Sequence, residues 1–134
     1  MIRIESNMDK YQYLDILKNN LDKVIADQGI TEYVFQHDND PKHTSKLVKG
    51  FLERCTFDTL AWPSQSPDMN PIEHLWGIVK RNIGNFRAKN DDEIWSKVCE
   101  EWYSIPNEAC RKLVKSMKKR VVTLHKAKGG HTKY

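Results

Sequence analysis

Hydrophobic residues recur at helical spacing near the start of the chain. The pattern comprises Tyr11, Leu14, Leu17, Leu21, Val24 and Ile25. Side chains three and four positions apart share one face of a helix, so the pattern predicts an amphipathic helix with one apolar stripe. Ser6, with Asp9 three residues later, has the form of a helix start, and Gln28-Gly29 marks the end. This stripe needs a partner to pack against.

Two segments rich in β-branched and aromatic residues flank a second helical pattern. Residues 31–36 and 57–62 each have the length of a strand, and the first strand stops at Asp38. The helix between them ends near Cys55 and has an apolar face formed by Leu47, Val48, Phe51 and Leu52. A strand, a helix and a strand with short connections predict a parallel pair.

The remainder of the chain predicts three helices. A loop from Pro63 to Pro71 leads into the first, Asn90 begins the second, and Pro106 opens the third. Their apolar faces comprise Ile72, Leu75, Trp76 and Val79, then Ile94, Trp95, Val98 and Trp102, then Cys110, Leu113, Val114, Met117, Val121 and Leu124. Because these tryptophans follow the helical spacing, we interpret them as core residues rather than base-stacking platforms.

The positive charge is concentrated in the last helix and tail. The net charge is +4, yet residues 1–110 hold 13 Lys or Arg against 18 Asp or Glu, and residues 111–134 hold nine basic residues and no acidic one. The predicted outer face of the last helix carries Arg111, Lys112, Lys115, Lys118, Lys119 and Arg120. Further basic residues lie near the loops, namely Lys42, Lys46, Lys49, Lys80, Arg81, Arg87 and Lys89. Contact with a phosphate backbone and simple solvation of helix faces both fit this distribution.

Length and composition bound the class of protein. The 134 residues fit one domain. No apolar run approaches the roughly 20 residues of a membrane span, and the N-terminus lacks the apolar stretch of a signal peptide. The three cysteines show no CxxC pairing, which argues against a zinc site or a disulfide framework. We therefore expect a soluble intracellular protein with no membrane partner.

Asp38 and Glu73 are the candidate metal ligands. The carboxyl ends of parallel strands border the crevice where open α/β sheets bind ligands, and Asp38 follows such a strand. Mg²⁺ prefers carboxylate oxygens, and phosphoryl transfer on nucleic acids uses two ions about 3.5–4 Å apart. Local alternatives also fit: Asp38 can cap the turn before Pro41, and Glu73 has the position of a capping-box glutamate behind Asn70 and Pro71.

Two motifs and their spacing favour metal binding over the capping alternatives. They are Gln36-His37-Asp38-Asn39-Asp40-Pro41-Lys42-His43 and Ser66-Pro67-Asp68-Met69-Asn70-Pro71-Ile72-Glu73. They resemble the DDE catalytic domain of the Tc/mariner transposases, in which 34 residues lie between an aspartate ending a strand and a glutamate opening a helix, as between Asp38 and Glu73 here. The resemblance implies that Asp38 and Glu73 are catalytic and bind metal, whereas Asp40 shapes the turn. Four neighbours could hydrogen-bond to a substrate phosphate or to a ligand, but we interpret them as a turn residue and satisfied surface histidines and leave them outside this set: Asn39, His37, His43 and His74.

The resemblance covers essentially the whole chain and implies its fold. That fold is α/β, RNase H-like and of the retroviral-integrase type, with a mixed five-stranded sheet. By this comparison the chain lacks the first two strands, the first catalytic aspartate and the family's helix-turn-helix domains. We expect residues 1–128 to form an N-terminally truncated domain with a helix-rich C-terminal half, residues 2–5 to be the remnant of a third strand, and residues 129–134 to be a disordered tail.

The resemblance also implies a chemistry and a location. In this family two Mg²⁺ or Mn²⁺ ions activate water and then a DNA 3′-hydroxyl for attack on phosphodiesters, which implies DNA as partner, DNA transposition and integration as ancestral role, and the nucleus as location. With one carboxylate missing, we expect weak ion binding and no transposition by the chain alone. The alternatives are a non-catalytic DNA- or protein-binding module, and a homo-oligomer or partner chain that supplies the missing strands.

Overall fold

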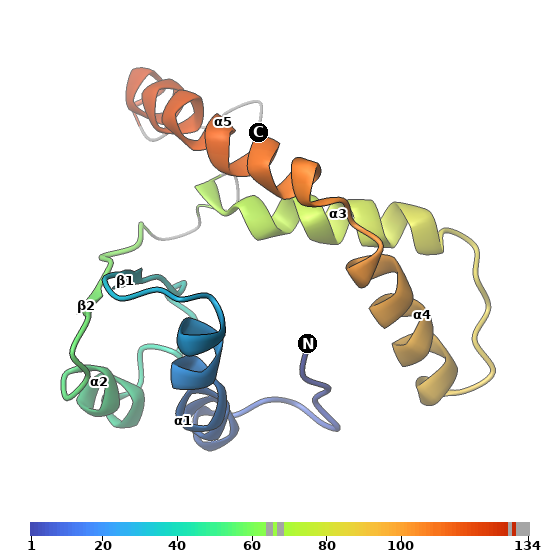
Figure 1. The fold of residues 1–134 in the computed structure, drawn as a ribbon, viewed down its shortest axis with the longest axis horizontal. Coiled ribbons are helices and arrows are strands. Elements are labelled where there is room, and N and C mark those ends of the chain that lie inside the picture. Colours follow the sequence, from blue (N-terminus) through green and yellow to red (C-terminus); the bar gives the residue numbers. More distant parts are fainter. Residues whose placement is uncertain (64–65, 67–68, 129, 131–134) are drawn as a thin grey trace. The chain divides into compact units, whose positions relative to one another are not determined.

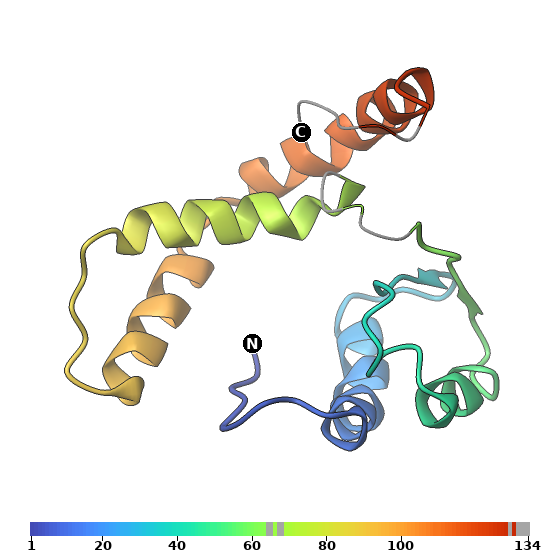
Figure 2. The same ribbon diagram turned by 180° about the vertical axis from the view of Figure 1, so that it is seen from behind.

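The computed structural model describes residues 1–63, 66, 69–128 and 130, and it divides the chain into two compact units (Figures 1 and 2). One unit spans Ile4–Gln65, and the other combines Met1–Arg3 with Ser66–Tyr134. Most of the predicted tail at 129–134 and part of the Ser66–Glu73 motif lie outside the described residues. None of the helices in the described part has both the length and the apolar character that a membrane span requires.

The first helix, α1 (Lys10–Asp27), begins three residues later than Ser6 predicts. Asp9 is the N-cap because its Oδ1 accepts hydrogen bonds from the backbone N–H groups of Tyr11 at 2.9 Å and Gln12 at 2.8 Å. The Gln12 side chain accepts in return from the Asp9 N–H at 3.2 Å, which completes a capping box. The predicted end is confirmed, since Gly29 reverses the chain with a φ of 62° after Asp27.

The predicted parallel pair is confirmed, although both strands are shorter than expected. β1 (Val34–Phe35) pairs with β2 (Asp58–Thr59) in the register Val34 to Asp58, and α2 (Lys46–Leu52) connects them. Residues 2–5 form no strand, so the prediction of a third strand there is wrong for this structure. A ladder forms only where two backbones pair, and within the described residues the sheet holds just these two strands.

The core of this first unit lies between α1 and α2, which pack against each other (Figure 1). Tyr13, Leu14 and Leu17 of α1 meet Val48 and Leu52 of α2. The predicted stripe of α1 is partly wrong, because two of its members are largely exposed, namely Tyr11 and Val24. The buried residues fix the face of α1 that turns inward, and Tyr13 belongs to that face.

The second unit is helical. α3 (Pro71–Ile83) packs against both α4 (Asp91–Tyr103) and α5 (Asn107–Lys126), as Figure 1 shows. The predicted core role of the tryptophans is confirmed for one pair, since the rings of Trp76 and Trp102 lie 4.7 Å apart between centroids. Val79 of α3 is almost completely buried, at 1% exposure.

The inner face of α5 differs from the predicted one. Val114 and Val121 are exposed, whereas Arg120, predicted on the outer face, is 2% exposed. The helical repeat explains this: Arg120 comes nine residues after Arg111, which is two and a half turns at about 3.6 residues per turn. Arg120 therefore lies on the side of α5 opposite Arg111.

Candidate active site

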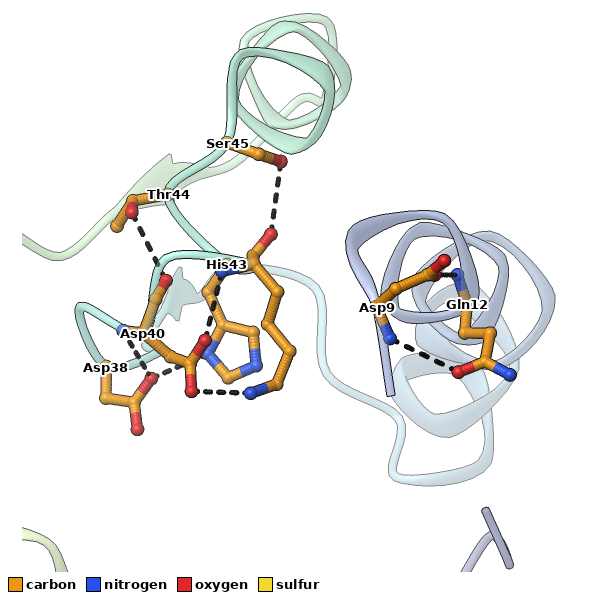
Figure 3. A network of polar contacts seen from close by, with 8 residues as sticks. Asp9, Gln12, Asp38, Asp40, His43, Thr44 and Ser45 are labelled. Carbon is orange, nitrogen blue, oxygen red and sulfur yellow. Dashed lines mark hydrogen bonds and ion pairs between the residues drawn. The ribbon is translucent and has the colours of Figure 1, made fainter. Parts of the chain in front are cut away.

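Asp38 lies three residues beyond β1 and has an open carboxylate. Its side chain is 56% exposed. Oδ1 accepts a hydrogen bond from the backbone N–H of Asp40 at 3.1 Å and lies 2.6 Å from Nδ1 of His43. Oδ2 has no partner in the described part of the chain and points away from the network in Figure 3. Asp38 thus caps the turn before Pro41, which was the local alternative to metal binding, but this contact uses only Oδ1.

His43 is held between Asp38 and the core of its unit. The side chain is 15% exposed, and its ring lies 3.9 Å from the ring of Tyr13 between centroids. Burial, and secondarily the charge of Asp38, raise the pKa of Tyr13 to about 12, so its hydroxyl stays protonated at neutral pH. The interpretation of His43 as a satisfied surface residue is wrong, because its Nε2 is buried without a hydrogen-bond partner among the described residues.

His37 is a second imidazole beside this network. Its ring centroid lies 5.9 Å from that of His43, and its Nδ1 is likewise buried without a partner in the described part of the chain. Burial lowers the pKa of His37, and the neighbouring His43 lowers it further. In the described part of the chain, the Asp38 carboxylate is hydrogen-bonded by Asp40 and His43, and His37 is not one of its partners.

Asp40 shapes the turn, as predicted. Its carboxylate accepts from the backbone N–H of Lys42 at 3.0 Å and from Nζ of Lys42 at 2.5 Å. Its carbonyl oxygen accepts from the N–H groups of His43 at 2.9 Å and Thr44 at 3.0 Å. These bonds to Lys42 lower the pKa of Asp40 below its ordinary value of 3.8. Asn39 also has a structural contact, because its Nδ2 donates to the carbonyl oxygen of Trp62 at 2.7 Å.

Glu73 stands in the first turn of α3 with an exposed side chain. Asn70 is the N-cap, with its Oδ1 3.4 Å from the Ile72 nitrogen, and Pro71 occupies the first turn, as predicted. The reciprocal bond of a capping box is absent from the described residues, because the Glu73 carboxylate accepts no hydrogen bond from the Asn70 N–H. Asn70 alone therefore caps α3, and the Glu73 carboxylate takes no part in the cap.

The residue after Glu73 contacts α5. The guanidinium of Arg120 lies 3.3 Å from Nε2 and 3.4 Å from Nδ1 of His74, and Nε of Arg120 donates to Ser116 Oγ at 2.9 Å. Burial lowers the pKa of His74, and the Arg120 charge lowers it further. A neutral imidazole is the form that tolerates a guanidinium at this distance.

The donors present suit Mg²⁺ or Mn²⁺ in type but are incomplete in number. Asp38 and Glu73 each offer carboxylate oxygens, the donors that hard divalent ions prefer. Within residues 1–63, 66, 69–128 and 130, no group of three His, Cys, Asp or Glu side chains is arranged to hold an ion. Asp38 and Glu73 also belong to different units, so the structure describes two half-sites, each by itself.

A family model and several known proteins match this chain. The model of the DDE superfamily endonucleases matches residues 3–95. The Tcb2 transposase of Caenorhabditis briggsae is 44% identical and the Tc1 transposase of Caenorhabditis elegans 42% identical over 132 residues. Each of these matches covers 98% of this chain and 48% of the relative, so the chain spans about half the length of the curated relatives it matches.

Solved structures show the same fold. The catalytic domain of the Mos1 transposase, in a structure with Mn, superimposes with a TM-score of 0.86 at 19% identity. This match covers 98% of the present chain and 69% of that one. A Mos1 paired-end complex with the left transposon end gives a TM-score of 0.85. The predicted RNase H-like fold is thereby confirmed as a partial domain, mostly helical, with a small parallel sheet. The chain belongs to the DDE superfamily endonucleases and carries part of a Tc1/mariner-type transposase catalytic domain.

Proposed function

We propose that Asp38 and Glu73 supply two of the carboxylates of a metal-dependent site for DNA strand cleavage and transfer. The observation that supports this most is the open Oδ2 of Asp38, at the carboxyl end of a parallel strand. Structures of the related Mos1 domain with Mn and with Mg support the choice of ions. The exposed Glu73 carboxylate, which takes no part in capping, supports its assignment as the second ligand.

The residues of the proposed site have separate roles. A bound Mg²⁺ or Mn²⁺ would polarise the attacking oxygen and stabilise the leaving oxygen of an in-line displacement. Asp38 and Glu73 present carboxylate oxygens for that ion, Asp40 and Lys42 fix the turn that carries Asp38, and Asn70 fixes the helix start that carries Glu73.

The proposal includes a limit on activity. Family members use a third carboxylate, and the described residues provide no third donor for an ion. The chain alone is therefore expected not to excise a transposon end. Slow Mn²⁺-dependent nicking of supercoiled plasmid is the most that two carboxylates would support.

A cleavage assay with the parent and three variants tests both the assigned ligands and the limit on activity. Plasmid nicking in Mn²⁺ is expected to disappear in Asp38→Ala and Glu73→Ala and to persist in Asp15→Asn, which alters an exposed carboxylate of α1 outside the proposed site. Nicking that survives both alanine substitutions would refute the assigned ligands. Excision of a terminal-repeat duplex by the unaided parent chain would refute the limit on activity.

A second candidate is a non-catalytic DNA-binding module. The basic side chains of α5 are exposed on one side of the helix: Arg111, Lys112, Lys115, Lys118, Lys119 and Lys126. Such a surface suits phosphates rather than base edges. The Mos1 paired-end complex with the left transposon end favours DNA as the partner. A salt titration of binding to unrelated duplexes distinguishes this candidate, because phosphate binding gives a steep salt dependence without sequence preference.

Two further proposals concern partners and location. Val34 in β1 is 57% exposed, and each strand of the two-stranded sheet has one unpaired edge in the described part of the chain, which favours association with a second copy or another chain. Light scattering of the purified chain tests this: dimers support it and a strict monomer refutes it. Action on chromosomal DNA would place the protein in the nucleus, which microscopy of a fluorescent fusion tests.

A further inference from the structure

Asp38 is tied to the core of its unit through two aromatic rings. Tyr13 is 9% exposed and belongs to the core cluster of α1 and α2. The His43 ring is tilted by 31° on the Tyr13 ring at 3.9 Å between centroids. His43 then reaches Asp38 through Nδ1, 2.6 Å from Oδ1. An exposed carboxylate in a loop is thus linked in two steps to the best-packed part of the unit.

The chemistry of these groups fixes the hydrogen positions. An ionised carboxylate only accepts hydrogen bonds, so Nδ1 of His43 must carry the hydrogen that it shares with Asp38. In the neutral imidazole Nε2 is then a bare acceptor. Nε2 is buried and has no partner among the described residues, so the hydrogen bond of this ring is the one that Nδ1 makes with Asp38.

The two bonds to Oδ1 also decide which way the carboxylate faces. Asp40 N–H and His43 Nδ1–H both approach the same oxygen, at 3.1 Å and 2.6 Å. With Oδ1 held from two sides, rotation about the Cα–Cβ bond would break both contacts. Oδ2 is consequently held away from these two contacts, where it can accept an ion.

From this geometry we infer that His43, supported by the ring of Tyr13, is a positioning residue that holds Asp38 in one rotamer with Oδ2 directed outward. The inference rests on the proposed function for its purpose, since an ordered Oδ2 matters when it binds an ion. Groups that orient metal ligands through hydrogen bonds typically change metal affinity by about 10- to 100-fold when removed. His43 is not itself a ligand in this account.

Two measurements without metal test the inference directly. Long-range ¹H–¹⁵N correlation spectra report the tautomer of His43, which is expected to be protonated at Nδ1 in the parent and to lose that preference in Asp38→Ala. Three-bond couplings of the Asp38 carboxyl carbon to its backbone nitrogen and carbonyl carbon report the rotamer about Cα–Cβ. They are expected to show one rotamer in the parent and averaging in His43→Phe, which keeps a ring against Tyr13 but removes the donor.

A third measurement links the rotamer to the ion. His43→Phe is expected to weaken Mn²⁺ binding about 10- to 100-fold, and His43→Asn, which restores a donor near the position of Nδ1, is expected to recover part of the loss. His37→Phe is the matched control, because it changes the adjacent imidazole without touching Asp38, and it is expected to leave the Asp38 rotamer and Mn²⁺ binding unchanged. Equal melting temperatures for these variants separate positioning from simple unfolding.

The outcomes separate the inference from the proposed function. A folded parent that binds no Mn²⁺ contradicts the proposed ligand role, and the tautomer and the rotamer then still decide the inference. An Nε2-protonated His43 in the parent, or one unchanged Asp38 rotamer in both His43→Phe and the parent, overturns it. Mn²⁺ binding that is equal in the parent and in His43→Phe overturns it as well.

Discussion

At the scale of single residues, hydrogen bonds distinguish two aspartates that stand two positions apart. Both carboxylate oxygens of Asp40 are engaged by Lys42, whereas Asp38 keeps Oδ2 open. An aspartate whose oxygens are both used in a turn has little left for an ion. The motif spacing had already favoured Asp38, and the contacts supply the physical reason for that choice.

The Asp40–Lys42 contact predicts a pH dependence of stability. Because the pKa of Asp40 is lowered below 3.8, its contribution is fully present above pH 3.8 and is lost as the pH falls through the lower pKa of the folded state. The contribution is no more than about 1 kcal/mol, since the pair is partly exposed. Urea unfolding of the parent and Asp40→Asn from pH 7 to 3 should show a difference that shrinks only below pH 3.8. Asp15→Asn, which changes an exposed carboxylate of α1, is the control, and a difference that persists at pH 3 would contradict the account.

At the scale of elements, capping side chains set the starts of α1, α2, α3 and α4 more sharply than hydrophobic spacing does, whereas α5 begins after Pro106 without a side-chain cap. Asn90 begins α4 as predicted, with its Oδ1 accepting from the Glu93 N–H at 2.9 Å. The start of α1 was predicted at Ser6, because that segment also fits a capping pattern, and the structure places the cap at Asp9. Two overlapping patterns within four residues cannot be separated by residue type alone.

The N-cap of α1 predicts a specific loss of stability. Asp9→Ala removes both hydrogen bonds from the first turn and is expected to lower the free energy of unfolding by about 1 kcal/mol. Ser6→Ala changes the predicted N-cap that the structure does not use, and it is expected to have little effect on the free energy of unfolding. Urea denaturation of the three proteins measures both values. Equal losses, or a larger loss for Ser6→Ala, would mean that the helix begins earlier in solution.

The buried arginine of α5 predicts a larger effect. Arg120→Ala removes the packing and hydrogen bonds of a 2% exposed side chain and is expected to cost about 2 kcal/mol of unfolding free energy. Lys119→Ala, an exposed neighbour on the same helix, is expected to stay within about 0.5 kcal/mol of the parent. Similar values for both substitutions, measured by urea denaturation, would show that Arg120 is solvated.

The sequence predicts the element order and type better than the strands' extent or each helix's inner face. The helices at 71–83, 91–103 and 107–126 follow from capping residues and periodicity. The strands were overestimated, since β-propensity describes six-residue segments while a ladder of two residues depends on the available partner. The burial of Arg120 was missed because a charged residue counts as an outer one by type, and only its angular position reveals otherwise.

At the scale of the whole molecule, the sequence predicts the candidate ligands but not the residues that support them. Asp38 and Glu73 could be singled out from two motifs and their spacing, and these two residues now belong to two compact units. The contribution of Tyr13 and His43 could not be predicted, because 30 positions separate residues whose rings touch. Contacts of that kind depend on how α1 packs beside the turn after β1.

The basic side of α5 predicts how DNA binding responds to salt. Replacing Lys115, Lys118 and Lys119 with Gln is expected to reduce the slope of log affinity against log salt by about 2 to 3, since each lost phosphate contact contributes about 0.9. The matched control replaces Lys10, Lys18 and Lys23 of α1 with Gln, which removes the same charge elsewhere. Fluorescence anisotropy with one duplex at several salt concentrations measures both slopes. Equal reductions would indicate an effect of net charge rather than a surface on α5.

Calorimetric titration of Mn²⁺ into the purified chain is the decisive test of whether Asp38 and Glu73 are metal ligands. We expect weak binding by the parent, loss of binding in both Asp38→Ala and Glu73→Ala, and retained binding in Asp15→Asn, which changes an exposed carboxylate of α1. Binding that survives either alanine substitution, or a folded parent that binds no Mn²⁺, would contradict the claim.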